Sequence, residues 1–174
     1  MPPEYAGGLG DAGVDALKAF VTAGGTLICL DQSGELAISA FTLPVKDVVR
    51  EAGADKIFCP GSILRVELDA SQPLAFGMNP HTAGFFASSS AFESTSTPAD
   101  GGAAARALTI ARYADKDVLV SGWLEGESVI AGKPGVVQLP VGSGRVVLLG
   151  FPVQHRAQSL ATFRLLFNAI LTAP

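Results

Sequence analysis

Clusters of basic residues are missing from this sequence of 174 residues, in which 16 Asp and Glu outnumber 12 Lys and Arg for a net charge of −4. Proteins that bind nucleic acid need a concentrated positive surface, so the sequence argues against such a partner. Long apolar runs are missing as well, and none approaches the roughly 18 residues of a membrane-spanning helix. The first residues lack the basic and apolar regions of a signal peptide. We expect neither a nucleic-acid partner nor a membrane.

Cysteine and histidine are scarce, with two of each. Cys29 lies in an apolar run and Cys59 precedes a Pro-Gly pair, so both are expected to be small buried side chains, and a disulfide between them stays open. Neither His81 nor His155 has Cys, His or carboxylate neighbours at the spacing of a zinc site. The sequence predicts no metal and no cofactor in this chain.

Apolar residues and glycine make up much of the chain, with 48% hydrophobic residues, 20 glycines and only 16% charged residues. This composition predicts one folded domain over residues 1–174 with many tight turns. Residues 94–102 are polar and contain Pro and Gly, which is typical of a flexible loop.

Hydrophobic periodicity predicts the order of the elements. The first half is expected to contain helices over 11–23, 34–41 and 45–52, strands over 26–30 and 62–69, a helical turn over 74–76 and an extended segment over 83–92. Asp11 is expected to cap the first helix. The second half is expected to contain strand-like 107–113, mixed 118–124, a hairpin of 135–139 and 145–149, and a helix over 157–171. One apolar stripe of that last helix holds Leu160, Phe163, Phe167, Ile170 and Leu171.

Asp31 stands where the apolar run Thr26–Leu30 ends and a helical pattern begins. In an open α/β sheet, ligands and catalytic groups collect beyond the carboxyl end of such a strand. A nucleophile elbow would place Cys or Ser at this bend, whereas here Cys29 comes two residues earlier and Ser33 two residues later. The candidates for chemistry are Asp31 and Ser33 with His155 as a distant partner. The alternative is that Asp31 caps the next helix.

The segment Gly8–Gly13 fits the pattern G-x-G-x-x-G in front of a helix, and Asp31 follows the next strand. This order is typical of a dinucleotide-binding fold. The motif demands a buried strand before it, but the chain has a Pro-rich segment there, and Asp11 would place a negative charge beside a pyrophosphate. A glycine-rich loop entering a capped helix explains the same residues.

Three segments, PPEYAGGLGDAGVDALKAFVTAGGTL, FCPGSILRVELD and GRVVLLGFPVQHRAQSLATFRLLFNAI, together carry a resemblance to a known family. They resemble the class I glutamine amidotransferase-like domain found at the C-terminus of bacterial zinc carboxypeptidases of the carboxypeptidase A type, peptidase family M14. The resemblance implies an α/β fold, a flavodoxin-like or Rossmann-like three-layer sandwich. It also implies truncation at the N-terminus, before the first βα units, and an antiparallel hairpin near the C-terminus.

Departures from the family pattern bear on activity. The resemblance places Asp31 where the nucleophilic Cys would stand, and a carboxylate cannot form the thioester of glutamine hydrolysis. The His-x-x-Glu pair of the peptidase zinc site is also absent. The resemblance therefore implies a non-catalytic accessory or interaction domain of a larger zinc carboxypeptidase-like protein, with zinc confined to an upstream peptidase domain.

The expected partner is that upstream peptidase domain or a homodimer partner, because a truncated sheet leaves an open edge and an uncovered apolar face. Such a parent would be secreted or periplasmic, and otherwise the chain is expected in the cytoplasm. Two alternatives remain. One is a hydrolase that uses Ser33 or Asp31 with His155, and the other is a sensor domain for a small molecule or nucleotide near Gly8–Gly13 and Asp31.

Overall fold

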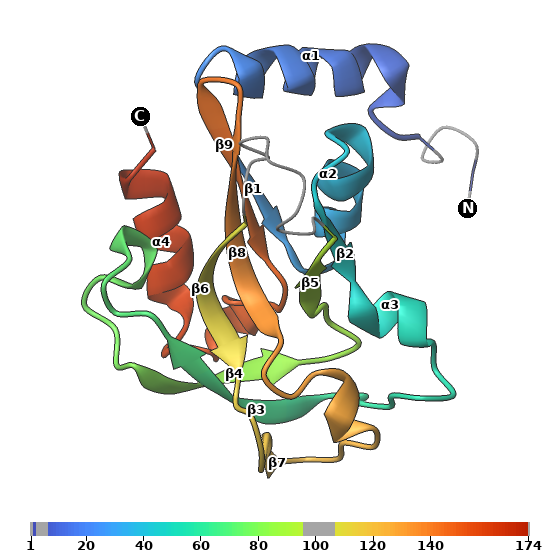
Figure 1. The fold of residues 1–174 in the computed structure, drawn as a ribbon, viewed down its shortest axis with the longest axis vertical. Helices are drawn as coiled ribbons and strands as arrows, with labels where there is room; N and C mark the ends of the chain where they lie inside the picture. The colour runs from blue at the N-terminus through green and yellow to red at the C-terminus, as the bar shows by residue number, and fades with distance from the viewer. Residues whose placement is uncertain (1, 3–6, 96–106, 174) are drawn as a thin grey trace.

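Strands dominate the computed structural model, which describes residues 2, 7–95 and 107–173 (Figure 1). The main sheet contains β1 (Thr26–Leu30), β3 (Ser62–Leu68), β4 (His81–Phe86), β6 (Leu108–Tyr113), β7 (Leu119–Ser121), β8 (Pro134–Val141) and β9 (Gly144–Leu149). A small sheet pairs β2 (Val45–Asp47) with β5 (Phe92–Ser94). The α-helices are α1 (Gly10–Thr22), α2 (Gly34–Ala40), α3 (Val48–Ala52) and α4 (Phe163–Leu171). Short 3-10 turns are η2 (Asp31–Ser33), η3 (Pro73–Ala75), η4 (Glu127–Val129) and η5 (His155–Ala157).

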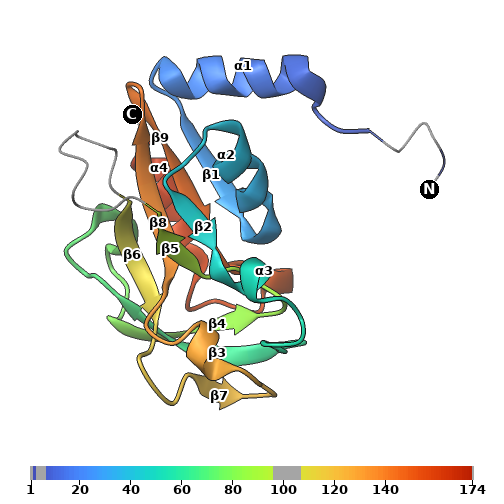
Figure 2. The same cartoon turned by 45° about the vertical axis from the view of Figure 1, so that its right-hand side comes forward.

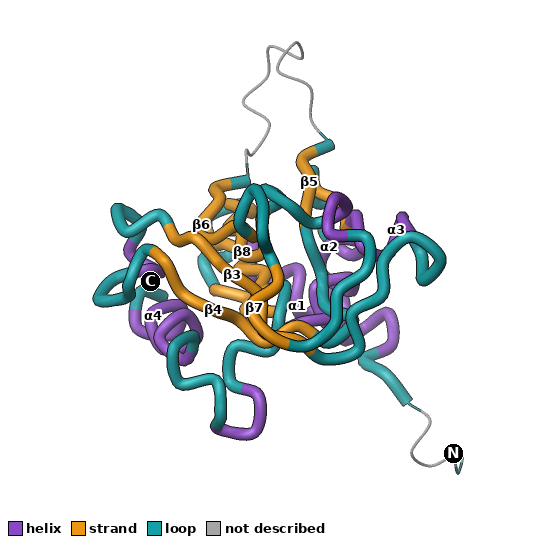
Figure 3. The backbone as a smooth tube through the Cα atoms, turned by 90° about the horizontal axis from the view of Figure 1, so that it is seen from below, coloured by secondary structure: helices purple, strands orange, loops and turns teal. Residues whose placement is uncertain are grey.

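The seven-stranded sheet has the order β1-β9-β8-β6-β3-β4, with β7 also paired to β3. Within the described residues, β1 and β9 form its one parallel pair, and the other pairs are antiparallel. The sheet curls into a half-barrel, which Figures 2 and 3 show from the side and from below. The predicted flavodoxin-like or Rossmann-like three-layer sandwich is therefore wrong.

The physical reason lies in how the strands are connected and buried. Parallel neighbours need crossover connections of a dozen or more residues, whereas antiparallel neighbours can be joined by a tight hairpin. Here β8 and β9 are joined by two residues, Gly142 and Ser143. β3 alternates between buried residues and more exposed ones, as the sequence predicted, and this alternation is typical of an antiparallel strand with one wet face.

The hairpin of β8 and β9 is buried on both faces. Val147 and Leu149 pack in one hydrophobic cluster, which includes Leu165 and Ala169 of α4. Val146 and Leu148 pack in a second cluster, which includes Ala37 of α2, Val45 and Phe92. All four hairpin side chains are fully buried. The hairpin therefore forms a shared wall between the two halves of the core.

The turn of this hairpin packs against the end of α1. The amide N–H of Ser143 donates to the carbonyl of Thr22 at 3.1 Å, and the N–H of Arg145 donates to the carbonyl of Gly25 at 3.1 Å. The turn thereby satisfies a carbonyl that the end of a helix leaves without an intrahelical partner. At its other end, α1 begins after Leu9 with no side-chain cap, so the predicted capping by Asp11 is wrong.

Arg145 connects three elements through its guanidinium group. Its Nε donates to Thr26 Oγ1 of β1 at 3.2 Å, and Nη1 contacts Gln138 Oε1 of β8 at 3.4 Å. Its Nη2 donates to the carbonyl and the hydroxyl of Thr172, just after α4. A cation at a helix C-terminus is favoured by the helix dipole. Arg145 thus fixes the last turn of α4 beside the start of β1.

Helix α4 presents a different face to the core from the one predicted. Its buried residues are Leu165 and Ala169, whereas Phe167, Ile170 and Leu171 are 55%, 54% and 80% exposed. Apolar residues occur on nearly every side of this helix, so periodicity alone did not select the packing face. The helix also begins six residues later than predicted, after η5.

Most remaining predictions of local structure are confirmed, with shifts of a few residues. The strand over 26–30, the helix over 34–41, the strand over 62–69 and the hairpin are confirmed. The helix over 45–52 is wrong in its first half, which forms β2, and the extended segment over 83–92 is divided into β4 and β5. Most of the loop over 94–102 lies outside the described residues.

Substituting Gly144 with alanine is expected to destabilise the fold by about 2–3 kcal/mol, because the new Cβ would lie 2.2 Å from the carbonyl oxygens of both Val21 and Gly25. Neither backbone oxygen can move without disturbing the contact between α1 and the hairpin. Urea unfolding followed by circular dichroism measures the change. Gly8→Ala is the control, because nothing lies within 4 Å of its Cβ position, and it should change stability by less than about 0.5 kcal/mol. Equal stability of the two variants would contradict this packing.

Candidate functional site

Asp31 forms the corner between β1 and α2. Its φ of 52° lies in the left-handed region, which is uncommon for residues other than glycine but is tolerated by aspartate. The carboxyl oxygen Oδ1 is buried and has no hydrogen-bond partner among the described residues. Burial raises the pKa of Asp31, the Ser89 hydroxyl lowers it in part, and the negative charge of Asp47 raises it further. The carboxyl does not cap α2, which begins after Ser33 with no side-chain cap.

The side chains of Cys29 and of the candidate Ser33, on either side of Asp31, are not activated for nucleophilic attack. Burial raises the pKa of the Cys29 thiol to about 11, and the Ser33 hydroxyl offsets only part of that effect. The thiol therefore stays protonated and weakly nucleophilic at neutral pH. The hydroxyl of Ser33 donates to the carbonyl of Leu30 at 2.7 Å. Cys59 is also buried, so the prediction that both cysteines are small buried side chains is confirmed. Both are free thiols, and no disulfide joins them.

His155 begins η5, and its ring stacks on Phe85 of β4 with centroids 4.2 Å apart. Within the described part of the chain, no hydrogen bond or ion pair joins this imidazole to Asp31 or Ser33. General base catalysis needs the base within hydrogen-bond reach of the nucleophile, directly or through one water. The structure therefore does not assemble the predicted nucleophile and base.

The segment Gly8–Gly13 lies far from Asp31 along the fold. It enters α1 at the N-terminal end, α1 leads into the start of β1, and Asp31 follows the end of β1 (Figure 1). In both views α1 crosses the top of the molecule with its N-terminal end pointing away from the sheet, whereas β1 runs down from the other end of α1 toward Asp31 (Figures 1 and 2). The structure does not bring them together into the nucleotide site that their order in the sequence indicated.

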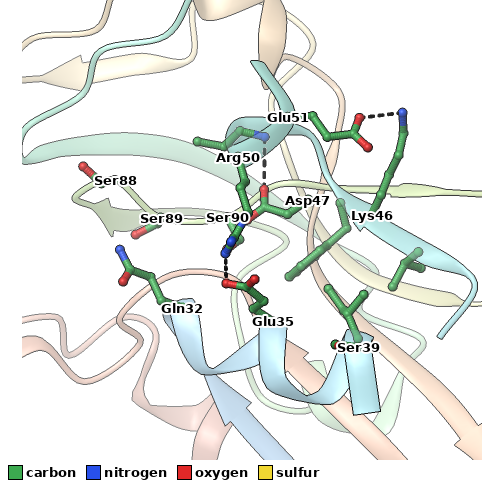
Figure 4. A pocket seen from close by; sticks show the side chains of 14 residues that line it. Gln32, Glu35, Ser39, Lys46, Asp47, Arg50, Glu51, Ser88, Ser89 and Ser90 are labelled. Carbon is green, nitrogen blue, oxygen red and sulfur yellow. Dashed lines mark hydrogen bonds and ion pairs between the residues drawn. The ribbon is translucent and has the colours of Figure 1, made fainter. Parts of the chain in front are cut away.

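A pocket opens next to the Asp31 corner (Figure 4). Its volume is about 500 Å³, within the range of small-molecule sites. Three parts of the chain form it: η2 with α2, β2 with α3, and the loop 88–90 that ends before β5. The apolar lining consists of Ile38, Val45, Val49 and Phe92, and the polar lining consists of Gln32, Glu35, Ser39, Lys46, Asp47, Arg50, Glu51, Ser88, Ser89 and Ser90.

Charged side chains of the pocket are paired with one another. Arg50 of α3 forms an ion pair with Glu35 of α2 across the opening (Figure 4). Lys46 lies 2.7 Å from Glu51 and 3.4 Å from Glu93. These pairings raise the pKa of Lys46, with the Glu51 carboxylate as the main cause.

Asp47 is held by the backbone on two sides. Its Oδ1 accepts hydrogen bonds from the N–H groups of Val49 at 3.0 Å and Ala91 at 3.3 Å. The first bond caps α3, and the second ties α3 to the start of β5. The pocket wall is therefore fixed by a carboxylate that has its own partners.

A second candidate surface is the outer side of α4 together with Leu160 in the turn before it. We call it the α4 face and define it as Leu160, Phe167, Ile170 and Leu171, whose exposed fractions run from 54% to 80%. Phe167 packs edge-on against Phe163 with ring centroids 6.4 Å apart, which continues the apolar surface along the helix. Groups of exposed apolar side chains are typical of interaction sites.

Neither a metal-ligand cluster nor a membrane-spanning helix is found among the described residues. No group of three His, Cys, Asp or Glu side chains there is placed to hold a metal ion. No helix in the described ranges has both the length and the apolar character needed to cross a bilayer.

Comparisons with known proteins bear on the fold alone. No family model and no curated protein matches the chain. Among solved structures, the β-galactosidase of Bacillus circulans sp. alkalophilus is similar, with a TM-score of 0.52 and 10% identity over 94% of this chain. The β-galactosidase of Rahnella sp. R3 is similar with a TM-score of 0.50 and 14% identity, also over 94% of this chain. This chain spans about a fifth of their length, 20% and 21% respectively.

These neighbours correct the predicted family. Their likeness covers nearly the whole chain and follows the curled, sheet-rich architecture. The resemblance to a glutamine amidotransferase-like domain of zinc carboxypeptidases is therefore wrong, because local similarity in three segments did not reflect how the strands pair.

Sequence reasoning missed the pocket and the α4 face. The run Ser88-Ser89-Ser90 in an otherwise apolar segment was a usable signal for the pocket. Glu35 and Arg50 carried none, because they come from helices whose relative placement only the fold determines.

Substituting Asp31 with asparagine is expected to stabilise the protein at pH 7 by about 1 kcal/mol, because it removes a charge whose oxygen is buried without a partner. Asparagine tolerates the positive φ. A carboxyl whose pKa is raised above its ordinary value of 3.8 by folding makes stability fall as pH rises through that window. The advantage of the variant should therefore grow from about pH 4 to pH 7.

Asp69→Asn is the matched control of opposite sign. Hydrogen bonds from Ser71 and Gln72 lower the pKa of the exposed Asp69 carboxyl. The charged carboxylate therefore stabilises the fold at neutral pH, and this effect is lost as the pH falls through the lowered pKa. Thermal melts from pH 3 to pH 8 compare both variants with the original chain. An Asp31 variant less stable at pH 7 than at pH 4, relative to the original chain, would contradict the assigned environment.

Proposed function

We propose that this chain is a non-catalytic accessory domain that associates with a second copy of itself through the α4 face. The observation that carries the proposal is the exposure of Leu160, in the turn before α4, and of Leu171 on α4, at 72% and 80%, while the other side of the helix is anchored in the core. Leaving such side chains in water forgoes roughly 1.5–3 kcal/mol each. A covering partner recovers that energy.

The α4 face is rigidly presented, which favours a role in binding. Asn168 Nδ2 donates to the carbonyls of Leu74 and Phe76 at 2.9 and 3.0 Å, so η3 and the residue after it are tied to the helix. Phe76 is itself 75% exposed and extends the apolar surface beside the helix. Arg145 holds the other end of the helix through Thr172.

Two further observations support a role without catalysis. Among the described residues His155 makes no hydrogen bond to Asp31 or Ser33, and Cys29 stays protonated at neutral pH. The structural match also covers only 20% of the β-galactosidase chain, which favours a domain that works as part of a larger protein. The zinc carboxypeptidase parent depended on the corrected resemblance and is not carried forward.

Replacing Phe167 and Leu171 together by glutamate is expected to weaken association at least tenfold, because two charges would have to be desolvated on binding. Sedimentation velocity of the purified chain between about 1 and 100 µM measures self-association, in which a second copy covers the face. The original chain should show a rise in sedimentation coefficient with concentration that the double variant lacks.

The matched control replaces the exposed Gln154 and Gln158 by glutamate, which adds the same charge outside the α4 face. It should associate like the original chain. A chain that stays monomeric at every concentration, or that loses association equally in both variants, would contradict the proposal.

A further inference from the structure

We infer that the pocket beside Asp31 binds a neutral, hydroxyl-rich small molecule the size of one or two sugar rings. This inference is independent of the proposed role of the α4 face. It stands on the volume of the pocket, on the mutual neutralisation of its charges and on the uncharged hydrogen-bonding groups that are left without partners.

The charges of the pocket argue against an anionic ligand. Arg50 is engaged by Glu35, and Lys46 is engaged by Glu51 and Glu93. Three of the five charged lining residues are acidic, so the local balance is negative. A phosphate or carboxylate would need to break an existing ion pair and would still meet the excess of carboxylates.

A cation also lacks a free carboxylate. Glu35 and Glu51 are each paired with a base. Asp47 already accepts two backbone N–H bonds, as an N-cap of α3 does. The lining side chains that remain without any partner are therefore uncharged.

Four neutral side chains supply those groups. Gln32, Ser39, Ser88 and Ser90 line the pocket, and among the described residues their side chains make no hydrogen bond (Figure 4). Each hydroxyl both donates and accepts, and the amide of Gln32 offers two donors and an acceptor. A ligand that carries several hydroxyl groups is complementary to this set, because each of its groups also donates and accepts.

The pocket floor fits the apolar side of such a ligand. Ile38 and Val49 are partly exposed, and Val45 and Phe92, which also line the pocket, are nearly fully buried. Small-molecule sites commonly combine an apolar lining with a few placed polar groups. The C–H faces of a sugar ring or cyclic polyol would cover this floor while its hydroxyls meet the four neutral side chains.

Hydrogen bonds fix the loop at the rim of the pocket. Ser89 is buried, its hydroxyl accepts the N–H of Ala87 at 3.2 Å, and its interaction with Asp31 connects the loop to the corner after β1. The N–H of Ser90 donates to the carbonyl of Gly150 at 2.6 Å. Ser88 and Asp31, on the two sides, both have a φ of 52°, a strained backbone that often marks functional sites.

Binding is tested by titrating the ¹⁵N-labelled chain with glucose, galactose, mannose, xylose, myo-inositol and maltose, and with glucuronate and glucose 6-phosphate as charged counterparts. At least one neutral compound should bind with a Kd below about 10 mM, a range expected for a few neutral hydrogen bonds. The amide shifts should map to Gln32, Ser39 and 88–90. The charged counterparts should bind at least tenfold more weakly.

Variants separate the pocket from chance binding. Gln32→Leu and Ser39→Ala change exposed residues, should fold normally by circular dichroism, and should each weaken binding about fivefold or more. Gln158→Leu, exposed and outside the pocket, should not change the Kd. Glu35→Gln leaves Arg50 unpaired and should raise the affinity for glucuronate relative to glucose severalfold.

Three outcomes of the titration would overturn the inference. They are no binding of any neutral compound at 50 mM, preferential binding of the charged compounds by the original chain, and shifts that map outside the pocket. Unchanged affinity in both the Gln32 and the Ser39 variants would overturn it as well.

Discussion

The burial of the β8–β9 hairpin on both faces is the constraint on which the rest of this structure depends. Val146 and Leu148 face one cluster, while Val147 and Leu149 face the other. A strand can serve two cores in this way only if it is apolar at consecutive positions. The run of four apolar residues in β9 meets that condition, and both α2 and α4 find their packing surfaces against the hairpin.

The corner after β1 carries backbone strain and an unpaired buried oxygen as a result of this arrangement. β1 pairs with β9 in register from Thr26–Arg145 to Leu30–Leu149, so the chain must turn sharply where the buried pair ends. At that point Asp31 has a strained backbone conformation, and its carboxyl oxygen Oδ1 is buried. The turn sends α2 back across the sheet, and the space between α2 and α3 becomes the pocket.

Local signals in the sequence were sufficient for much of this fold. The alternation over 62–68, the hairpin and the strand before Asp31 were all predicted, because each depends on residues close together in the chain. The same hairpin and alternation were evidence for an antiparallel sheet. The glycine-rich and apolar segments nevertheless favoured a family whose strands run parallel, and that prediction was wrong.

The misjudged features depend on contacts between distant residues. Nothing in the spacing of α4 indicated that Leu165 and Ala169, rather than Phe167 and Ile170, would meet the sheet. Residues 45–47 have the pattern of a helix start, yet pairing with 92–94 draws them into β2. The candidate site was half predicted: Asp31 and Ser33 lie at the corner, as expected, but His155 stacks on Phe85 and the residues that line the pocket gave no joint signal.

The shared wall has a consequence for how this protein opens. The backbone amides of β8 and β9 lie between two packed clusters, so loosening either α2 or α4 alone leaves them covered on the opposite side. Their exchange with solvent deuterium then requires the whole sheet to come apart, whereas amides in the α1 segment near Leu9, where the helix is exposed, exchange through local fraying. The hairpin is thus the last part of the molecule to lose protection.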